Sequence, residues 1–256
     1  MTKMTINEIK NMLAASDLEG LPALLATLEG DSRAGVTKLV EYYKKWYTKA
    51  CAEKARLEGM LFFENKYAEF GLIAGVDEAG AGPLAGPVAA AAVVLPQGCI
   101  IDGLDDSKKL SANKREELAA VIREVALCYA VRFVDNNEID RINILQARMK
   151  AMAMAVDALA TRPDYVLFDG NHMPDVGLPR VGIQGGDSRS MSIAAASVLA
   201  KVERDALMDK YHEIYPEYGF DRHKGYGTAE HMAAITEHGV TEIHRRTFCQ
   251  MLETRY

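Results

Sequence analysis

The sequence predicts an α/β fold in which a mixed five-stranded sheet is flanked by helices. Three observations support this prediction. Apolar side chains recur at helical spacing through residues 1–70, two β-rich runs follow at 71–76 and 88–95, and helices then alternate with strands. Because the pattern changes at residue 71, we expect an N-terminal helical appendage over 1–70 and an α/β domain over 71–256 with a helical C-terminal part.

The N-terminal appendage is expected to contain three amphipathic helices that begin near residues 6, 21 and 35. The third extends to about residue 66 and includes a basic stretch at 44–49. Such a stretch can contact nucleic acid, but a run of charges on a helix is more commonly a solvated face. We therefore interpret the appendage as structural.

The α/β domain is expected to alternate strands and helices after its first two strands. A turn rich in glycine and proline joins those two strands, and Ser111 is a suitable N-cap for the first helix that follows. The expected strands are 71–76, 88–95, 127–134, 165–168 and 180–183, and the expected helices are 112–126, 144–160, 189–211 and 228–237. From about residue 212 the chain is mostly helical.

Composition limits the class of protein. The 256 residues allow one good-sized core or a core with an appendage, and no apolar run reaches the roughly 18 residues of a membrane span. The start of the chain has no apolar signal core. Four cysteines are scattered without a paired motif, which argues against a zinc site or a disulfide framework and favours the cytoplasm. A net charge of −6 argues against coating nucleic acid by charge alone, but it is compatible with a nuclease.

The first chemical signal is the pair Asp77 and Glu78, at the end of an apolar run and directly before the glycine-rich turn. Neighbouring strand residues point to opposite faces, so the two acids do not read as two solvated charges on one surface. A buried carboxylate needs a partner, and a divalent cation is a usual one. The alternative is a strand end with one acid exposed.

Two further acids follow the same design. Asp169 ends an apolar run before Gly170, and Asp187 lies in Gly-Gly-Asp-Ser at the start of a helix. The alternatives are an ordinary Asp-Gly turn and a helix N-cap. If these acids converge with Asp77 and Glu78, the four carboxylates resemble the clusters of two-metal phosphoryl chemistry, where Mg²⁺ or Mn²⁺ suits an all-oxygen ligand set.

Three polar and basic motifs accompany the acids. They are Asp-Ser-Lys108-Lys109-Leu, Arg-His-Lys-Gly-Tyr226-Gly-Thr and Ile-His-Arg245-Arg246-Thr-Phe. The lysines can bind phosphate, Tyr226 can stack on a sugar or base, and the arginines can bind phosphate or pair with acids. The alternatives are a solvated turn for the lysines and a partly buried loop anchor for the tyrosine.

These motifs, in this order, resemble bacterial ribonuclease HII, the type 2 ribonuclease H, over roughly residues 71–248. The resemblance rests on Asp-Glu-Ala-Gly-x-Gly-Pro-Leu-Ala-Gly-Pro-Val, Asp-Ser-Lys-Lys-Leu, Asp-Gly, Gly-Asp-Ser, Ser-Ile-Ala-Ala-Ala-Ser, Ala-Lys-Val-x-Arg-Asp, Lys-Gly-Tyr-Gly-Thr and His-Arg-Arg-x-Phe. It implies the ribonuclease H fold and cleavage of RNA in RNA/DNA hybrids. It also implies cutting at single ribonucleotides in duplex DNA, giving 5′-phosphate and 3′-hydroxyl ends. The helical N-terminal segment resembles the extension of some bacterial members.

The resemblance also assigns roles. Metal-binding and catalytic roles fall on Asp77, Glu78, Asp169 and Asp187, and substrate-binding roles on Gly80, Ala81, Gly82, Lys108, Lys109, Lys201 and Tyr226. The implied cofactor is Mn²⁺ or Mg²⁺. The implied partners are an RNA/DNA hybrid or a DNA duplex containing ribonucleotides, with no membrane, and we expect a monomer. One metal held by two of the aspartates would activate water, and a second would stabilise the leaving 3′-oxygen.

The chain departs from the family at Ala81, where the family pattern has arginine between two glycines. Alanine cannot replace the planar donors that a guanidinium offers to phosphate. Either this is a natural variant with a weaker grip on the substrate, or the position was engineered, which we favour because the rest of the turn is unaltered. The alternative function is therefore a hybrid-binding form with impaired turnover. A third possibility is another carboxylate nuclease of this fold, such as a junction resolvase.

Overall fold

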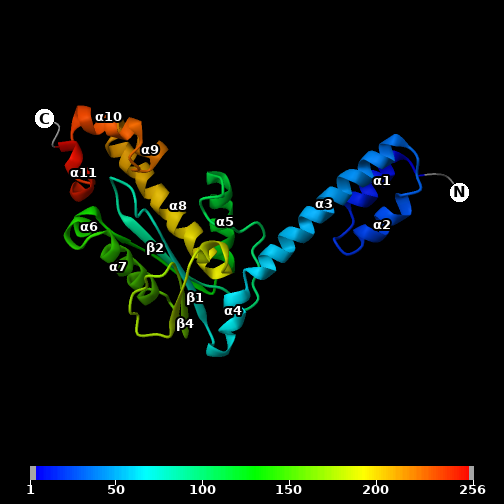
Figure 1. Ribbon diagram of the computed structural model, residues 1–256, viewed down its shortest axis with the longest axis horizontal. Helices are drawn as coiled ribbons and strands as arrows, with labels where there is room; N and C mark the ends of the chain where they lie inside the picture. The colour runs from blue at the N-terminus through cyan, green and yellow to red at the C-terminus, as the bar shows by residue number, and fades with distance from the viewer. Residues whose placement is uncertain (1–3, 254–256) are drawn as a thin grey trace. The chain divides into compact units, whose positions relative to one another are not determined.

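The computed structural model describes residues 4–253, with side chains described through residue 250, and the chain forms two compact units (Figure 1). The first unit ends at Gly59 and the second begins at Met60. Residues 60–70 therefore belong to the second unit, whereas the sequence pattern alone placed the change at residue 71. No helix among residues 4–253 is long and apolar enough to cross a membrane.

The first unit consists of three helices, α1 (Ile6–Ala14), α2 (Leu21–Leu28) and α3 (Ala34–Gly59). A capping box between Thr5 and Glu8 begins α1. Their core is made by apolar side chains from all three helices, namely Ile9, Leu13, Leu21, Leu25, Val36 and Val40. The predicted third helix does not run on to residue 66. It ends at Gly59, and a separate short helix, α4 (Phe62–Lys66), begins the second unit.

The second unit is built on a mixed five-stranded sheet with the order β3-β2-β1-β4-β5, which confirms the predicted fold class. The strands are β1 (Ile73–Ala79), β2 (Val88–Val94), β3 (Cys128–Val134), β4 (Tyr165–Asp169) and β5 (Arg180–Ile183). The β1–β2 and β2–β3 pairs are antiparallel, and the β1–β4 and β4–β5 pairs are parallel.

The first strand continues three residues beyond its predicted end, because its ladder with β2 extends to Ala79. Asp77 and Glu78 therefore lie inside β1, opposite Ala91 and Ala90 of β2, rather than just after the strand. Since side chains alternate along a strand, the two acids are directed to opposite faces of the sheet. The extended strand thus separates a pair of carboxylates that are adjacent in sequence.

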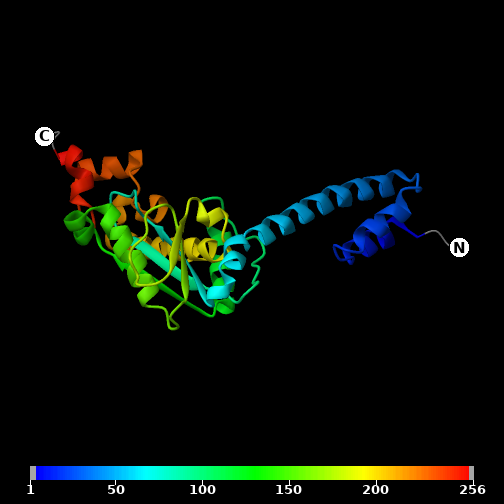
Figure 2. The same ribbon diagram turned by 60° about the horizontal axis from the view of Figure 1, so that its bottom comes forward.

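Two long helices cover the two faces of the sheet (Figures 1 and 2). On one face α8 (Met191–Ile214) packs along β1 and β2, with α5 (Ala112–Val125) beside it. Gly75 allows this close approach, because a Cβ there would overlap the α8 backbone at Ser192. On the other face, α6 (Asn136–Ile142) and α7 (Ile144–Asp157) follow β3, and apolar residues of α7 pack against β1 and β2.

The C-terminal part is helical as predicted, with α9 (Phe220–His223), α10 (Ala229–His238) and α11 (Arg246–Glu253). Its own apolar cluster joins the end of α8 to the turn after β1, through Ala85, Met208, Tyr218, Phe220, Ala234, Ile235 and Ile243. Short helices such as α4, α6 and α9 were not expected, because four to seven residues carry too little periodicity to be read from sequence.

Candidate metal centre and substrate loop

Asp77 lies at the centre of the candidate site, in β1 and on the face that α8 covers. Its side chain is 3% exposed, and its Oδ1 accepts a hydrogen bond of 2.7 Å from the amide of Glu78. The hydroxyl of Ser197 on α8 also bonds to it. Ser197 is in turn 2.9 Å from the hydroxyl of Ser107, so the loop that carries Lys108 is tied to the same place.

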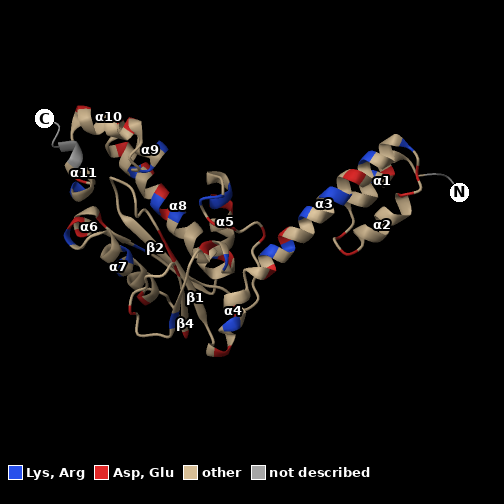
Figure 3. Ribbon diagram, in the orientation of Figure 1, with Lys and Arg blue, Asp and Glu red and all other residues tan. Residues whose placement is uncertain are grey.

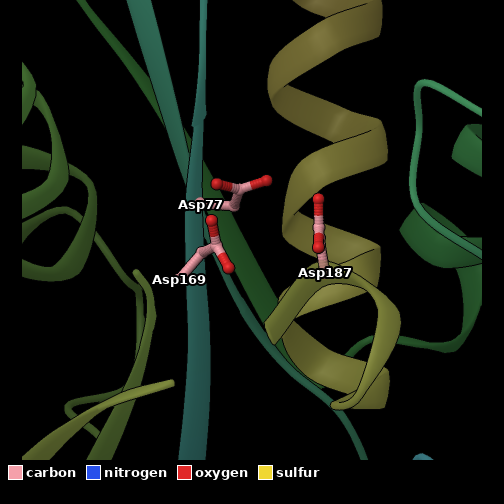
Figure 4. A group of neighbouring side chains, drawn as sticks. All are labelled: Asp77, Asp169 and Asp187. Carbon is pink, nitrogen blue, oxygen red and sulfur yellow. The ribbon is translucent and has the colours of Figure 1, made fainter. Parts of the chain in front are cut away.

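Asp169 and Asp187 converge on Asp77 (Figure 4). Asp169 is the last residue of β4, the parallel neighbour of β1, and its Oδ1 accepts from the amide of Gly186 at 2.7 Å. That bond holds the short turn Gly186–Ser188, which contains Asp187. One carboxylate oxygen from each aspartate lies within 4.8 Å of the others. We call these three residues the carboxylate cluster.

Asp187 is not the N-cap of α8, which was one interpretation of its motif. The cap is Ser190, whose hydroxyl accepts from the amide of Ile193. The intervening 3₁₀ turn lifts Asp187 out of the helix start and directs it toward the strand ends. Its carboxylate is thus available for another partner.

Glu78 is not one of the three residues of the carboxylate cluster, although its charge acts on Asp77 and that of Asp169 acts on it. It faces α7, where its Oε1 lies 2.5 Å from the guanidinium of Arg148. Its other oxygen, Oε2, is buried and has no hydrogen-bond partner in the described part of the chain. Burial raises the pKa of Glu78, Arg148 lowers it and Asp169 raises it. The structure therefore brings together three of the four expected carboxylates, with the fourth anchored by an arginine.

The carboxylate cluster has an excess of negative charge. Burial, followed by the charges of Glu78 and Asp169, raises the pKa of Asp77 well above its usual value. Burial and the charge of Asp169 likewise raise the pKa of Asp187. Lys108 relieves part of this excess, because its Nζ lies 3.4 Å from Asp187. A divalent cation fits the all-oxygen donor set and would remove the remaining repulsion.

The loop that follows β1 is held from below by two buried arginines, Arg204 and Arg245, each 0% exposed. Within the described residues neither binds a carboxylate. Their guanidinium groups donate to backbone carbonyls instead. Arg204 donates to the carbonyls of Ala85, Pro87 and Lys224, and Arg245 donates to those of Gly80, Ala81 and Gly86. The sequence suggested phosphates or acids as partners for Arg245, whereas the buried guanidinium donates to three backbone carbonyls.

This support orients the loop. Arg245 holds the carbonyls of Gly80 and Ala81 at 2.6 and 2.9 Å, and in a trans peptide the next amide points the opposite way. The amides of Ala81 and Gly82 are therefore directed outward, and neither has a partner within residues 4–253. Gly80 itself has φ of +91°, and a Cβ there would overlap the side chain of Arg204. Its glycine is thus required by the buried arginine.

Tyr226 lies beside this loop, with its side chain 43% exposed. A Cβ on Gly82 would stand 3.8 Å from its Cε1, so the ring and the loop form adjacent surfaces. The Nζ of Lys201 is 5.9 Å from the ring centroid and is held by Asp205 at 2.7 Å. Lys109 turns elsewhere, to Asp105 at 3.0 Å.

Two buried histidines, His231 and His244, fix the backbone of Tyr226, and the sequence assigned a role to neither. His244 Nδ1 accepts from the amide of Thr241, so in the neutral ring its Nε2 carries the proton and donates to His231 Nε2 at 3.0 Å. His231 Nδ1 then donates to the Tyr226 carbonyl at 3.0 Å. Burial lowers the pKa of each histidine to about 4. Both rings are therefore neutral near pH 7.

Comparison with known proteins decides the family. The sequence model for ribonuclease HII matches residues 74–251, and the model for the ribonuclease HII N-terminal domain matches residues 5–68. The chain belongs to the ribonuclease HII family. The protein is accordingly a ribonuclease H hydrolase, and both units have counterparts in the family.

Relatives match over nearly the whole chain. Ribonuclease HII of Lactobacillus delbrueckii subsp. bulgaricus is 47% identical over 98% of this chain and 97% of its own length. That of Clostridioides difficile is 45% identical over 97% of this chain and 98% of its own length. Among solved structures, ribonuclease H2 from Pyrococcus horikoshii OT3 has 27% identity and a TM-score of 0.63, covering 72% of this chain and 98% of its own. The chain thus shares its fold with that protein over 72% of its length.

Proposed function

We propose that this ribonuclease HII hydrolyses the RNA strand of RNA/DNA hybrids and also cuts at single ribonucleotides embedded in duplex DNA. The observation that carries the proposal is the carboxylate cluster, together with the outward amides of Ala81 and Gly82, which follow Asp77 by four and five residues. Five residues span at most about 18 Å, so cleavage and ribose recognition would take place on the same short stretch of substrate. The expected products have 5′-phosphate and 3′-hydroxyl ends.

Asp77, Asp169 and Asp187 would hold the divalent metal, Mg²⁺ or Mn²⁺, with the unpartnered Oε2 of Glu78 as a further donor. When bound, such an ion supplies a water nucleophile at neutral pH and stabilises charge on the scissile phosphate. Among the protein's own groups, Ser197 and the Gly186 amide hold two of these carboxylates in place. Lys108 is mostly exposed, with 77% of its side chain accessible, and would contact a phosphate oxygen.

Recognition of a single ribonucleotide would need only one ribose. The amides of Ala81 and Gly82 can donate to a 2′-hydroxyl, which distinguishes RNA from DNA. The exposed ring of Tyr226 can pack against the same sugar. Because this surface consists of one loop and one ring, it does not require a run of ribonucleotides, and an all-DNA duplex lacks the group that it reads.

The test is cleavage by Asp169→Asn of a DNA duplex that contains one ribonucleotide, with Mg²⁺ and Mn²⁺ in parallel. The amide oxygen of asparagine can still accept from Gly186, so the fold is retained while a metal-binding charge is lost. We expect the rate to fall about 1,000-fold or more, because several kcal/mol of charge stabilisation is removed.

Asp175→Asn is the matched control, because Asp175 is 80% exposed and its carboxylate pairs with Arg180 outside the cluster. It should cleave at the parent rate. An Asp169→Asn variant as fast as the parent would refute the metal assignment. Equal cleavage of an all-DNA duplex by the parent would refute the ribose-reading loop.

The second candidate is a hybrid-binding form with impaired turnover, and Ala81 motivates it. Its carbonyl is held by Arg245, so the backbone of the loop does not depend on the missing family side chain. Ala81→Arg, measured beside the parent on the same duplex, separates the candidates. Equal rates would make the position immaterial, whereas cleavage by the arginine variant alone would favour the binding form.

A further inference from the structure

The outward face of α3 carries lysines and aromatic rings in a continuous row. The opposite face turns its apolar residues toward the core of the first unit, with Val36, Val40, Tyr43 and Tyr47 among them. The outward row follows helical spacing, and all its members are exposed; it consists of Lys38, Tyr42, Lys45, Trp46 and Lys49, which we call the α3 stripe. Figure 3 shows Lys and Arg recurring along this helix.

The two rings of the α3 stripe are unusually open for their size. The side chain of Tyr42 is 62% exposed and that of Trp46 is 43% exposed. Tyr43, which packs on the core, touches both edge-on, with centroids 5.3 Å from Tyr42 and 6.4 Å from Trp46. The exposed rings are thus supported from beneath while their outer surfaces face solvent.

The lysines of the α3 stripe have no ion-pair partner within the described residues. Their neighbours off the stripe do: Lys44 lies 2.6 Å from Glu29, and Arg56 lies 2.7 Å from Glu53. In a chain with a net charge of −6, this row brings together three exposed lysines without an ion pair, and Glu41 lies beside it on the same helix. Such a row is complementary to a phosphate backbone.

We propose that the α3 stripe binds single-stranded nucleic acid. Base faces would stack on Trp46 and Tyr42, and phosphates would meet the lysines. With a rise of about 1.5 Å per residue, Lys45 and Lys49 stand about 6 Å apart along the helix, a spacing suited to successive phosphates. A duplex offers such rings few free base faces, so an unpaired strand is the better occupant. This activity goes beyond the proposed function, since it needs neither the carboxylate cluster nor a 2′-hydroxyl.

Other occupants fit the α3 stripe less well. A second copy of the chain would bring its own lysines against these three, and like charges in contact repel. A membrane-binding helix needs a broad apolar face, whereas the α3 stripe has two rings and no aliphatic side chain. Both remain outcomes that the experiment can return.

The experiment titrates the full-length protein with a twelve-residue oligo(dT) and follows tryptophan fluorescence, which reports on the stripe because Trp46 is the one tryptophan of the chain. Anisotropy of a labelled strand gives a second readout. We expect quenching that weakens with salt. Lys45→Ala/Lys49→Ala should reduce the slope of log K against log salt by about 1.4, since each phosphate contact contributes roughly 0.7.

The matched control is Lys10→Ala/Lys54→Ala, which makes the same change of charge in the first unit but off the α3 stripe. Its slope should equal that of the parent. Absence of quenching, or an equal loss in both double variants, would overturn the proposal. A response to phosphatidylglycerol vesicles without one to oligo(dT) would assign the surface to membranes. Self-association that Lys45→Ala/Lys49→Ala abolishes would assign it to a second copy.

Cleavage of the single-ribonucleotide duplex is measured in the same preparations. At saturating substrate, Lys45→Ala/Lys49→Ala should keep the parent rate, because the α3 stripe is outside the catalytic unit. If the parent cleaves but does not bind oligo(dT), the surface proposal fails and the proposed function stands. If it binds oligo(dT) but does not cleave, the reverse holds.

Discussion

The carboxylate cluster and the two buried arginines beneath the Gly80–Gly82 loop differ in how their charges are balanced. In the cluster, burial and then the charges of Glu78 and Asp169 raise the pKa of Asp77. Beneath the loop, every carbonyl that Arg204 and Arg245 face receives an N–H donor. The carboxylate cluster lacks balancing positive charge, which favours binding of a cation. The arginines beneath the loop have all their described hydrogen bonds within the protein, which fixes the conformation of the loop. The unbalanced charges therefore lie where we expect the reaction, and the balanced polar groups lie where the loop is held in position.

The largest effect expected from this contrast is that Asp77→Asn abolishes cleavage and yet stabilises the metal-free protein. A raised carboxyl pKa makes the metal-free fold lose stability as pH rises from the usual carboxyl range through the raised value. Removing that buried charge should raise the free energy of unfolding at pH 8 by an amount on the order of 1 kcal/mol. The measurement is urea unfolding without metal, with cleavage assayed separately.

In the parent protein, a bound metal ion should neutralise the excess negative charge of the carboxylate cluster and so stabilise the fold. Mn²⁺ should raise the melting temperature more at pH 8 than at pH 6, because the ligands must be deprotonated to bind. Asp157→Asn, at the exposed end of α7, serves as the control and should behave like the parent. A destabilised metal-free Asp77→Asn would mean that the cluster is not under electrostatic strain.

The next largest effect concerns the satisfied region. Arg245→Leu leaves the carbonyls of Gly80, Ala81 and Gly86 without their donors in a buried place. We expect a loss of about 1–3 kcal/mol in the free energy of unfolding for each carbonyl left without a donor. Arg246→Leu is the matched control next in the chain, and because Arg246 is exposed it should cost less than about 0.5 kcal/mol.

Cleavage kinetics sharpen this second prediction. If the arginine only shapes the loop, Arg245→Lys, which keeps the charge but not the planar fork, should raise KM for the single-ribonucleotide duplex more than it lowers kcat. A fall in kcat with unchanged KM would place Arg245 in the chemical step and contradict the contrast between the regions.

The smallest effect at neutral pH is the acid response of the histidines beneath Tyr226, because it appears only as pH falls below about 6.5. Their native pKa of about 4 lies below the unfolded value of about 6.5, so the unfolded state binds more protons between these values. Their contribution is fully present above pH 6.5 and is lost as pH falls toward 4, by at most ~3 kcal/mol for each histidine. His244→Asn should remove part of this pH dependence, because asparagine does not titrate in this range. Its amide oxygen can still accept the hydrogen bond from the amide of Thr241, so the local structure is retained.

The measurement is urea unfolding from pH 4 to 7, taken as the difference between parent and variant, because the carboxylate cluster titrates in the opposite sense. His238→Asn, at an exposed position on α10, is the control and should keep the parent slope. An unchanged slope in His244→Asn would show that the buried pair does not govern acid stability.

The strands and the long helices were predictable because their periodicity is local. The meeting of Asp77 with Asp169 was also predictable, since β1 and β4 were expected to end in acids and parallel strands place such ends at one edge. The position of Glu78 was only half predictable. Strand alternation directed it away from Asp77, but the partner on the far face, Arg148 in α7, has no signal in the sequence.

The loop after β1 shows features that could not be predicted from the sequence. The family resemblance gave its glycines a substrate-binding role. Gly82 is exposed, as that role requires, whereas Gly80 is glycine because Arg204 fills the space of its side chain. The contacts of His231 and His244 join positions with no regular spacing. Such pairings depend on how α8 and α10 pack, and nothing local in the chain encodes them.

The sequence by itself determined the family motifs, the placing of acids at the ends of predicted strands, and the alternation that separates Asp77 from Glu78. It could do so because these properties follow from the local order of residues and from the period of two along a strand. Only the tertiary structure decided that Arg204 and Arg245 bind backbone carbonyls, and that Trp46 faces solvent. The reason is physical: burial and partner choice arise from contacts between segments far apart in the chain, where no local pattern can specify them.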